Sequence, residues 1–190
     1  MRRRNTKGFT LIEVVVVVAV IAILAAVLTP YITKYIDDSK IAKARNETQV
    51  IGGALTNFYK DVGQWPNRNP STGGAVTVLY TGGAAPNTYT NFVNAGSGTG
   101  WNGGSGNLDN NLLVNGNSGN LYPPSGDLRW KGPYSSGAMP VDPWGRPYLV
   151  NVAATGALWV ISAGPNQRIN TNAADNVIPS TADDIGFRVR

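Results

Sequence analysis

The 190-residue sequence contains no cysteine and no histidine, and only 14% of its residues are charged. Without cysteine, the chain has no disulfide, no thiolate nucleophile and no cysteine-bound zinc. Without histidine, it has no imidazole general base, no Ser-His-Asp triad and no histidine-bound metal. The remaining polar side chains give no convergent set of acid, base and nucleophile, so we expect that the protein is not an enzyme.

The net charge of +5 is concentrated at one end of the chain. Arg2, Arg3, Arg4 and Lys7 precede the first apolar run, and removing these four from the 16 basic residues leaves 12 against 11 acidic residues. Because no basic stripe remains to neutralise phosphates, we expect no nucleic-acid partner. A basic tip beside an apolar run is instead typical of a membrane-orientation signal that stays on the cytoplasmic side.

Residues 9–30 have the composition of a membrane-spanning helix. The run from Phe9 to Leu28, FTLIEVVVVVAVIAILAAVL, contains a single charged residue, Glu13. At about 1.5 Å per residue, a helix of this length crosses a hydrocarbon core of about 30 Å. The run is longer than the apolar region of a secretory signal peptide, which has about 7–15 residues, so we expect a single-pass helix that remains in the membrane.

Residues 31–60 predict a second, amphipathic half of the same helix. Pro30 lets the helix continue only with a kink and one lost backbone hydrogen bond. Beyond it, apolar residues recur at the three- and four-residue spacing of an amphipathic helix; these are Ile32, Tyr35, Ile36, Ile51, Ala54, Leu55 and Phe58. Glycine and proline in the turn at residues 61–70 end the helix.

Residues 71–126 form a Gly/Asn-rich insertion, with 13 glycines, 10 asparagines and Asp109 as the only charged residue. Such a stretch buries too little apolar surface for a large core. We expect a long surface excursion with short strands or docked loops, anchored by scattered aromatic side chains such as Trp101.

Residues 127–190 predict a small sheet. The runs Pro147–Val152 and Ala157–Ile161 are β-rich and separated by a short glycine-containing turn, which favours a hairpin, and Gly186–Arg190 adds a short edge strand. The amphipathic half of the helix is the only element long enough to cover this sheet. We therefore predict an α+β fold, in which a long kinked N-terminal helix packs on a small antiparallel sheet.

The string Lys7-Gly8-Phe9-Thr10-Leu11-Ile12-Glu13, followed by the apolar run and Pro30, closely resembles the type IV prepilin class. The resemblance implies a pilin-like fold, a basic leader peptide at residues 1–8, cleavage between Gly8 and Phe9, and N-methylation of Phe9. It also implies an aspartyl prepilin peptidase, which carries out both the cleavage and the methylation, as a partner.

Within that class, the C-terminal region resembles the major pseudopilin of type II secretion. The strings KGPY at residues 131–134 and MPVDPWGRPY at residues 139–148 carry this resemblance, with GQWP at residues 63–66 and the SAGPN and ADDIG strings at residues 162–166 and 182–186. The longer insertion and an Asn/Thr-rich segment at residues 167–181 depart from the family pattern. The family's usual tryptophan after the Asp-Ile-Gly step is also missing.

This second resemblance implies a filament subunit whose partners are further copies of itself, minor pseudopilins, the assembly platform and the membrane. It implies a location in the bacterial inner membrane with the globular part in the periplasm. The alternatives are a type IV pilin of an extracellular pilus, which the absence of cysteine disfavours and the large insertion favours, and a membrane-tethered binding domain.

Glu13 is the residue on which assembly is expected to depend. An ionised carboxylate in hydrocarbon costs several kcal/mol unless it is paired, and the apolar run offers no cation. Cleavage would give Phe9 a free amine about one helical turn away, and in a helical stack the amine of an adjacent subunit would neutralise Glu13. The pair would then select the docking register. The alternative is a glutamate that reaches out to the lipid headgroups.

Asp183 and Asp184 are candidate calcium ligands, with Asp175 as a weaker candidate. Calcium takes several oxygen ligands, including backbone carbonyls of a curled loop. In the pseudopilins that the sequence resembles, a structural Ca²⁺ holds the C-terminal loop on the sheet, and Asp184 lies in the matching Asp-Ile-Gly motif. Asn166 stands where the family often has aspartate and offers only a neutral oxygen. The alternative is a solvated acidic turn.

Overall fold

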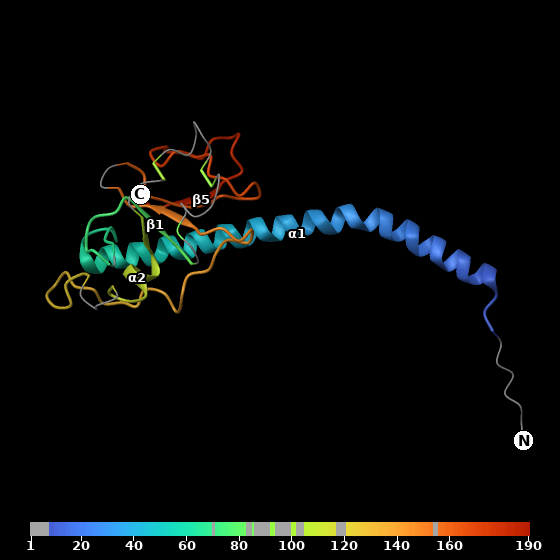
Figure 1. The fold of residues 1–190 in the computed structure, drawn as a ribbon, viewed down its shortest axis with the longest axis horizontal. Coiled ribbons are helices and arrows are strands. Elements are labelled where there is room, and N and C mark those ends of the chain that lie inside the picture. The colour runs from blue at the N-terminus through green and yellow to red at the C-terminus, as the bar shows by residue number, and fades with distance from the viewer. Residues whose placement is uncertain are drawn as a thin grey trace, which may run out of the picture. The chain divides into compact units, whose positions relative to one another are not determined.

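The computed structural model describes residues 8–69, 71–82, 85, 92–93, 100–101, 105–116, 121–153 and 156–190. Most of the predicted leader, residues 1–7, and parts of the predicted insertion lie outside the described residues. The chain divides into two compact units, Met1–Ser39 and Lys40–Arg190. One helix, α1 (Leu11–Val62), contributes residues to both units (Figure 1).

In the first unit, α1 is exposed along its whole length and continues through Pro30 without a break. Proline lacks an N–H group, so the helix loses one backbone hydrogen bond there. Two threonine hydroxyls on either side of the proline bond to carbonyls of the preceding turn: Thr29 Oγ1 donates to Ala25 O at 2.7 Å, and Thr33 Oγ1 donates to Pro30 O at 3.0 Å. The predicted helix is confirmed, and it is long and apolar enough to cross a membrane.

The second unit contains a five-stranded sheet with the strand order β2-β1-β3-β4-β5. The strands and one short helix are β1 (Val78–Tyr80), β2 (Ser105–Asn107), α2 (Asp109–Leu112), β3 (Leu149–Asn151), β4 (Trp159–Ser162) and β5 (Ile185–Arg188). The predicted hairpin is present as β3 and β4, which pair antiparallel with Val150 opposite Val160. The predicted edge strand is β5, where Phe187 lies opposite Val160.

The sheet is predicted to be antiparallel and is in fact mixed, because one pair of strands is parallel. β1 and β2 run parallel, with Leu79 opposite Gly106, whereas the other three pairs are antiparallel. Both strands lie inside the predicted insertion, and with three residues each they agree with the short strands expected there. Parallel strands need a connection of about a dozen or more residues, and residues 81–104 are long enough to return the chain in the same direction.

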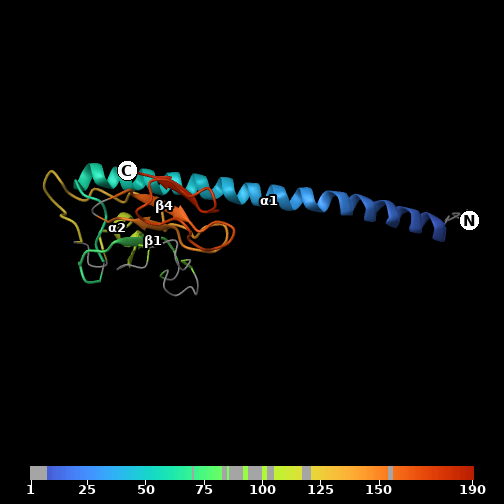
Figure 2. The same cartoon turned by 90° about the horizontal axis from the view of Figure 1, so that it is seen from above.

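The apolar face of α1 in the second unit packs against this sheet, and both views show the cyan-to-green end of the helix along it (Figure 1 and Figure 2). The buried helix residues in this core are Ile51, Ala54, Leu55, Phe58 and Val62. The predicted stripe is therefore confirmed from Ile51 onward. Its earlier members, Ile32, Tyr35 and Ile36, belong to the first unit and are 50–72% exposed.

Where the insertion is described, buried side chains anchor it to the second unit. Trp101 is 1% exposed, and its Nε1 donates a hydrogen bond to Thr171 O at 2.8 Å. Its ring belongs to a second apolar cluster that includes Phe92 and Ile169. Leu112 of α2 joins the core beneath α1. The expectation of an excursion anchored by aromatic residues is confirmed for Trp101.

Candidate functional site

The predicted cleavage site lies just outside the helix. Gly8, Phe9 and Thr10 have no regular secondary structure and are exposed, with Phe9 89% exposed. The carbonyl of Thr10 accepts the first helical hydrogen bond, from Val14 N at 3.4 Å. Thr10 is therefore the N-cap residue of α1, and the Gly8–Phe9 bond precedes the cap.

Glu13 forms a reciprocal set of hydrogen bonds with Thr10. Thr10 N and Thr10 Oγ1 both donate to Glu13 Oε2, at 2.8 and 2.7 Å, and Glu13 N donates to Thr10 Oγ1 at 3.4 Å. This arrangement is a capping box, which satisfies two backbone amides that a helix N-terminus otherwise leaves without partners. The Thr-x-x-Glu signal is present in the sequence at residues 10–13. The capping box was not predicted, because we considered only the charge of Glu13.

Asp184 is the most buried of the three candidate calcium ligands, with 7% of its surface exposed. Its Oδ2 accepts hydrogen bonds from Asn170 N at 2.9 Å, Thr171 N at 2.7 Å and Thr171 Oγ1 at 2.7 Å. Its Oδ1 is buried and has no hydrogen-bond partner among the described residues. Burial raises the pKa of Asp184, and the bonds from Thr171 and Asn170 oppose that rise.

The other two candidates bind different stretches of the same loop. Asp183 Oδ2 accepts a hydrogen bond from Asn166 N at 2.8 Å, and its Oδ1 accepts one from Asn166 Nδ2. Asp175 Oδ2 accepts from Asn172 N at 3.0 Å and Asn172 Nδ2 at 3.1 Å. Within the described residues, no group of three or more acidic side chains converges on one point. The three carboxylates thus fasten the loop by hydrogen bonds, and a calcium ion there stays a prediction, supported by the unpartnered Oδ1 of Asp184.

The Asp-Pro-Trp-Gly string is a turn held by Asp142. Its Oδ1 accepts hydrogen bonds from Trp144 N at 3.0 Å and Arg146 N at 2.8 Å, and its Oδ2 accepts one from Ser162 Oγ at 2.6 Å. Burial raises the pKa of Asp142, and the bond from Ser162 is the main opposing contribution. Because these bonds hold the turn and join it to β4, the geometry supports a structural role for Asp142.

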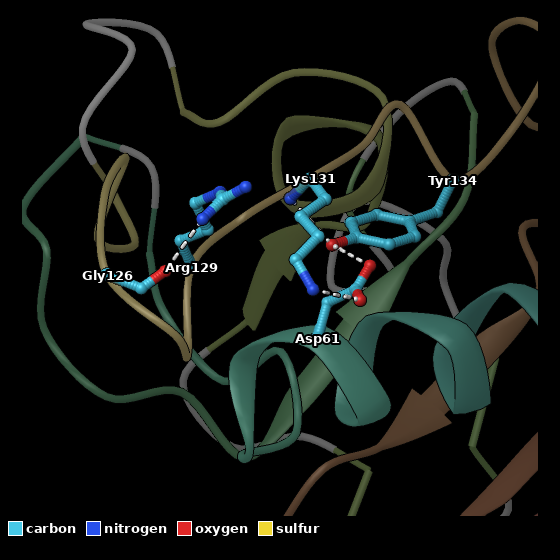
Figure 3. Close-up of polar contacts among 5 residues, drawn as sticks. All are labelled: Asp61, Gly126, Arg129, Lys131 and Tyr134. Carbon is cyan, nitrogen blue, oxygen red and sulfur yellow. Dashed lines mark hydrogen bonds and ion pairs between the residues drawn. The ribbon is translucent and has the colours of Figure 1, made fainter.

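The Lys-Gly-Pro-Tyr string fastens the end of α1 (Figure 3). Lys131 Nζ lies 3.1 Å from Asp61 Oδ1, and the hydroxyl of Tyr134 donates to Asp61 Oδ2 at 3.1 Å. Lys131 N also donates to the Tyr134 hydroxyl at 3.0 Å, so that each of the three residues bonds to the other two. The hydrogen bond from Lys131 lowers the pKa of Asp61. A motif that carried the resemblance to pseudopilins therefore joins a loop to the last turn of the helix.

Two parts of the chain match known protein families. Residues 3–29 match the prokaryotic N-terminal methylation motif, and residues 113–181 match type II secretion system (T2SS), protein G. The first match contains the capping box and the Gly8–Phe9 bond. The second contains β3, β4 and the turn at Asp142, and it ends before Asp183.

The curated relatives include both pilins and a pseudopilin. The fimbrial protein EcpC of Eikenella corrodens is 41% identical over 78 residues, which cover 41% of this chain and 51% of that protein. The type II secretion system core protein G of Pseudomonas aeruginosa is 33% identical over 67 residues, or 35% of this chain and 47% of that protein. The type IV major pilin protein PilE1 of Neisseria gonorrhoeae is 39% identical over 67 residues, or 35% and 41%.

The chain spans about half the length of the curated relatives it matches. No solved structure gives a significant match. The chain thus combines a long apolar helix on a small sheet with a match to the N-terminal methylation motif at the start of that helix, which makes it similar to type IV prepilins. Residues 113–181 are similar to protein G of the type II secretion system, and the similar curated proteins include pilins and one core protein G of that system.

Proposed function

We propose that this protein is a structural subunit of a type II secretion pseudopilus and that it polymerises through its N-terminal helix to drive protein export. The observation that carries the proposal is the match of residues 113–181 to protein G of that system. This region includes the motif residues that hold α1 to the globular unit, Lys131 and Tyr134, and the turn at Asp142. The proposed role is structural rather than enzymatic.

In this proposal the precursor sits in the bacterial inner membrane through the first half of α1, with the globular unit in the periplasm. The prepilin peptidase removes residues 1–8 and methylates the amine of Phe9. Subunits then dock through their apolar helices, with minor pseudopilins and the assembly platform as further partners. Docking would exchange lipid contacts for protein contacts along a surface that is exposed in the single chain.

A type IV pilin of an extracellular pilus is the second candidate. The names of several relatives favour it, because they are a fimbrial protein and a type IV major pilin. Both candidates share the cleavage site, the methylated amine and assembly through the helix. They differ in whether the filament extends outside the cell and in whether its loss abolishes protein secretion or the external fibres.

The two candidates are separated by deleting the gene in its native host and measuring two quantities. We expect loss of exported proteins from the culture medium, with no change in surface fibres seen by electron microscopy at native expression. Restoring secretion with the wild-type gene is the control. Loss of long external fibres with normal secretion would assign the protein to a pilus instead.

Processing is tested separately by intact mass spectrometry of the membrane-derived protein. We expect a mass that corresponds to loss of residues 1–8 and addition of one methyl group to Phe9. A mature protein that retains its arginine-rich end would contradict both candidate functions.

A further inference from the structure

The start of α1 is set by side chains as well as by the apolar run. Phe9 has ordinary helix propensity, so nothing in that residue itself stops the helix from reaching the predicted scissile bond. The helix nevertheless begins at Leu11, and the residue before it is the N-cap Thr10. Both halves of the capping box are formed, through the Thr10 hydroxyl and the Glu13 carboxylate.

The capping box is stronger in this place than on an ordinary surface helix. An unsatisfied amide near the hydrocarbon region costs more than one in water, because no solvent replaces the missing partner. The Thr10 hydroxyl accepts from one such amide, and the Glu13 carboxylate accepts from another. A chain that keeps these bonds therefore has one preferred helix start.

The consequence for the scissile bond follows from backbone geometry. A peptide bond inside a helix has its carbonyl turned along the axis, whereas exposed non-helical segments are the preferred sites of proteolysis. Gly8 and Phe9 are exposed and non-helical, and a side chain at Gly8 would meet nothing within 4 Å. The Gly8–Phe9 bond is thus exposed, and Phe9 is followed directly by the N-cap residue Thr10.

We propose that Thr10 is a positioning residue for the processing peptidase: its capping box with Glu13 starts the helix at Leu11, two residues after Phe9, and so presents the Gly8–Phe9 bond in a non-helical conformation. This inference rests on the proposed processing of the chain as a prepilin. Thr10 acts on the substrate's conformation before binding and does not itself touch the reacting atoms. Its loss should therefore raise KM more than it lowers kcat, because only a fraction of the substrate is competent to bind.

The test uses the full-length precursor in lipid nanodiscs with a purified prepilin peptidase, and follows loss of residues 1–8 by intact mass. Thr10→Val removes the hydroxyl and keeps the shape of the side chain. Loss of an N-cap of this kind changes the equilibrium constant between the capped and uncapped conformers by about two- to thirtyfold. We expect kcat/KM for cleavage to fall, mainly through KM, by a factor no larger than that change.

Two matched variants and one independent measurement accompany it. Thr10→Ser retains the hydroxyl and should restore cleavage. Thr29→Val removes a hydroxyl bond to Ala25 O in the same helix, far from the scissile bond, and should cleave like the wild type. Hydrogen exchange of the Leu11–Glu13 amides should accelerate in Thr10→Val alone.

Equal cleavage of Thr10→Val and the wild type would overturn the inference, whether or not the exchange rates change. So would an equal loss of cleavage in Thr29→Val, or failure of Thr10→Ser to restore cleavage. A wild-type precursor that the peptidase does not cut would be a different result, since it would remove the proposed function itself.

Discussion

Two adjacent glycines in α1, Gly52 and Gly53, face different surroundings and give a direct test of the helix–sheet packing. A Cβ atom at Gly52 would lie 2.5 Å from Cδ1 and 2.6 Å from Cε1 of Phe187 on β5. A Cβ atom at Gly53 would meet nothing within 4 Å. The helix therefore approaches the edge strand closely at Gly52, while Gly53 faces outward.

The two alanine variants share one free-energy contribution and differ in the other. Replacing glycine by alanine inside a helix stabilises it by about 1 kcal/mol at either position. At Gly52 the new methyl must displace the Phe187 ring, and overpacking of this kind costs about 1–3 kcal/mol. We expect Gly53→Ala to be more stable than the wild type by about 1 kcal/mol and Gly52→Ala to lie about 1–3 kcal/mol below Gly53→Ala.

The assay is urea unfolding of the full chain in detergent, followed by tryptophan fluorescence. All five tryptophans lie in the Lys40–Arg190 unit, so the signal reports that unit alone. Since the propensity gain is common to both variants, the difference between them measures the approach of Gly52 to Phe187. If Gly52→Ala proved as stable as Gly53→Ala, the packing of α1 on β5 described here would be wrong.

Three further predictions concern side chains of the globular unit. Because burial raises the pKa of Asp142, its contribution to stability is present below the unfolded-state pKa and lost as pH rises through the folded-state pKa. Asp142→Asn keeps the acceptor for Arg146 N and should flatten this part of the plot of unfolding free energy, measured in urea, against pH. Parallel plots for the variant and the wild type would exclude the effect. Lys131 lowers the pKa of Asp61, so their pair contributes stability above the unfolded-state pKa that is lost as pH falls through the folded-state pKa. Lys131→Met should remove this loss of stability at acid pH, which is measured by urea unfolding at a series of acid pH values. If the C-terminal loop binds calcium, added Ca²⁺ should raise the melting temperature of the wild type and leave Asp184→Asn unchanged, and a wild type insensitive to both Ca²⁺ and chelator would show a loop held by hydrogen bonds alone.

The elements that the sequence predicted correctly are those with a strong local pattern. The helix follows from an apolar run joined to a three- and four-residue spacing that ends in Ile51, Leu55 and Phe58. The β3–β4 hairpin follows from two β-rich runs separated by a short turn. In each case the residues that form the helix or the hairpin are near neighbours in the sequence, so a local sequence pattern is enough to predict the element.

The features that the sequence did not predict depend on contacts between residues far apart in the chain. β1 and β2 have three residues each, and β2 contains Gly106, so neither has a distinctive alternation. Their parallel pairing joins residues far apart in the sequence, with Val78 opposite Ser105, and β1 also pairs with β3. The role of Gly52 was equally hidden, because only the folded chain brings Phe187 against it. Thr10 is different: the Thr-x-x-Glu signal is local, but we considered only the charge of Glu13.

The capping box also changes the energetic argument for Glu13 in assembly. Both Thr10 donors reach Oε2, so Oε1 is left to accept a further donor such as the amine of an adjacent subunit. Docking then adds a partner to a carboxylate that is already partly satisfied, and the box need not break. Glu13→Gln separates the two roles, because glutamine can complete a capping box but carries no charge to pair with an amine. We expect this variant to be processed and inserted in the membrane, yet to give few filaments in a reconstituted assembly measured by sedimentation. A normal filament yield from Glu13→Gln would show that the charge pair does not select assembly, and would leave Glu13 with its helix cap alone.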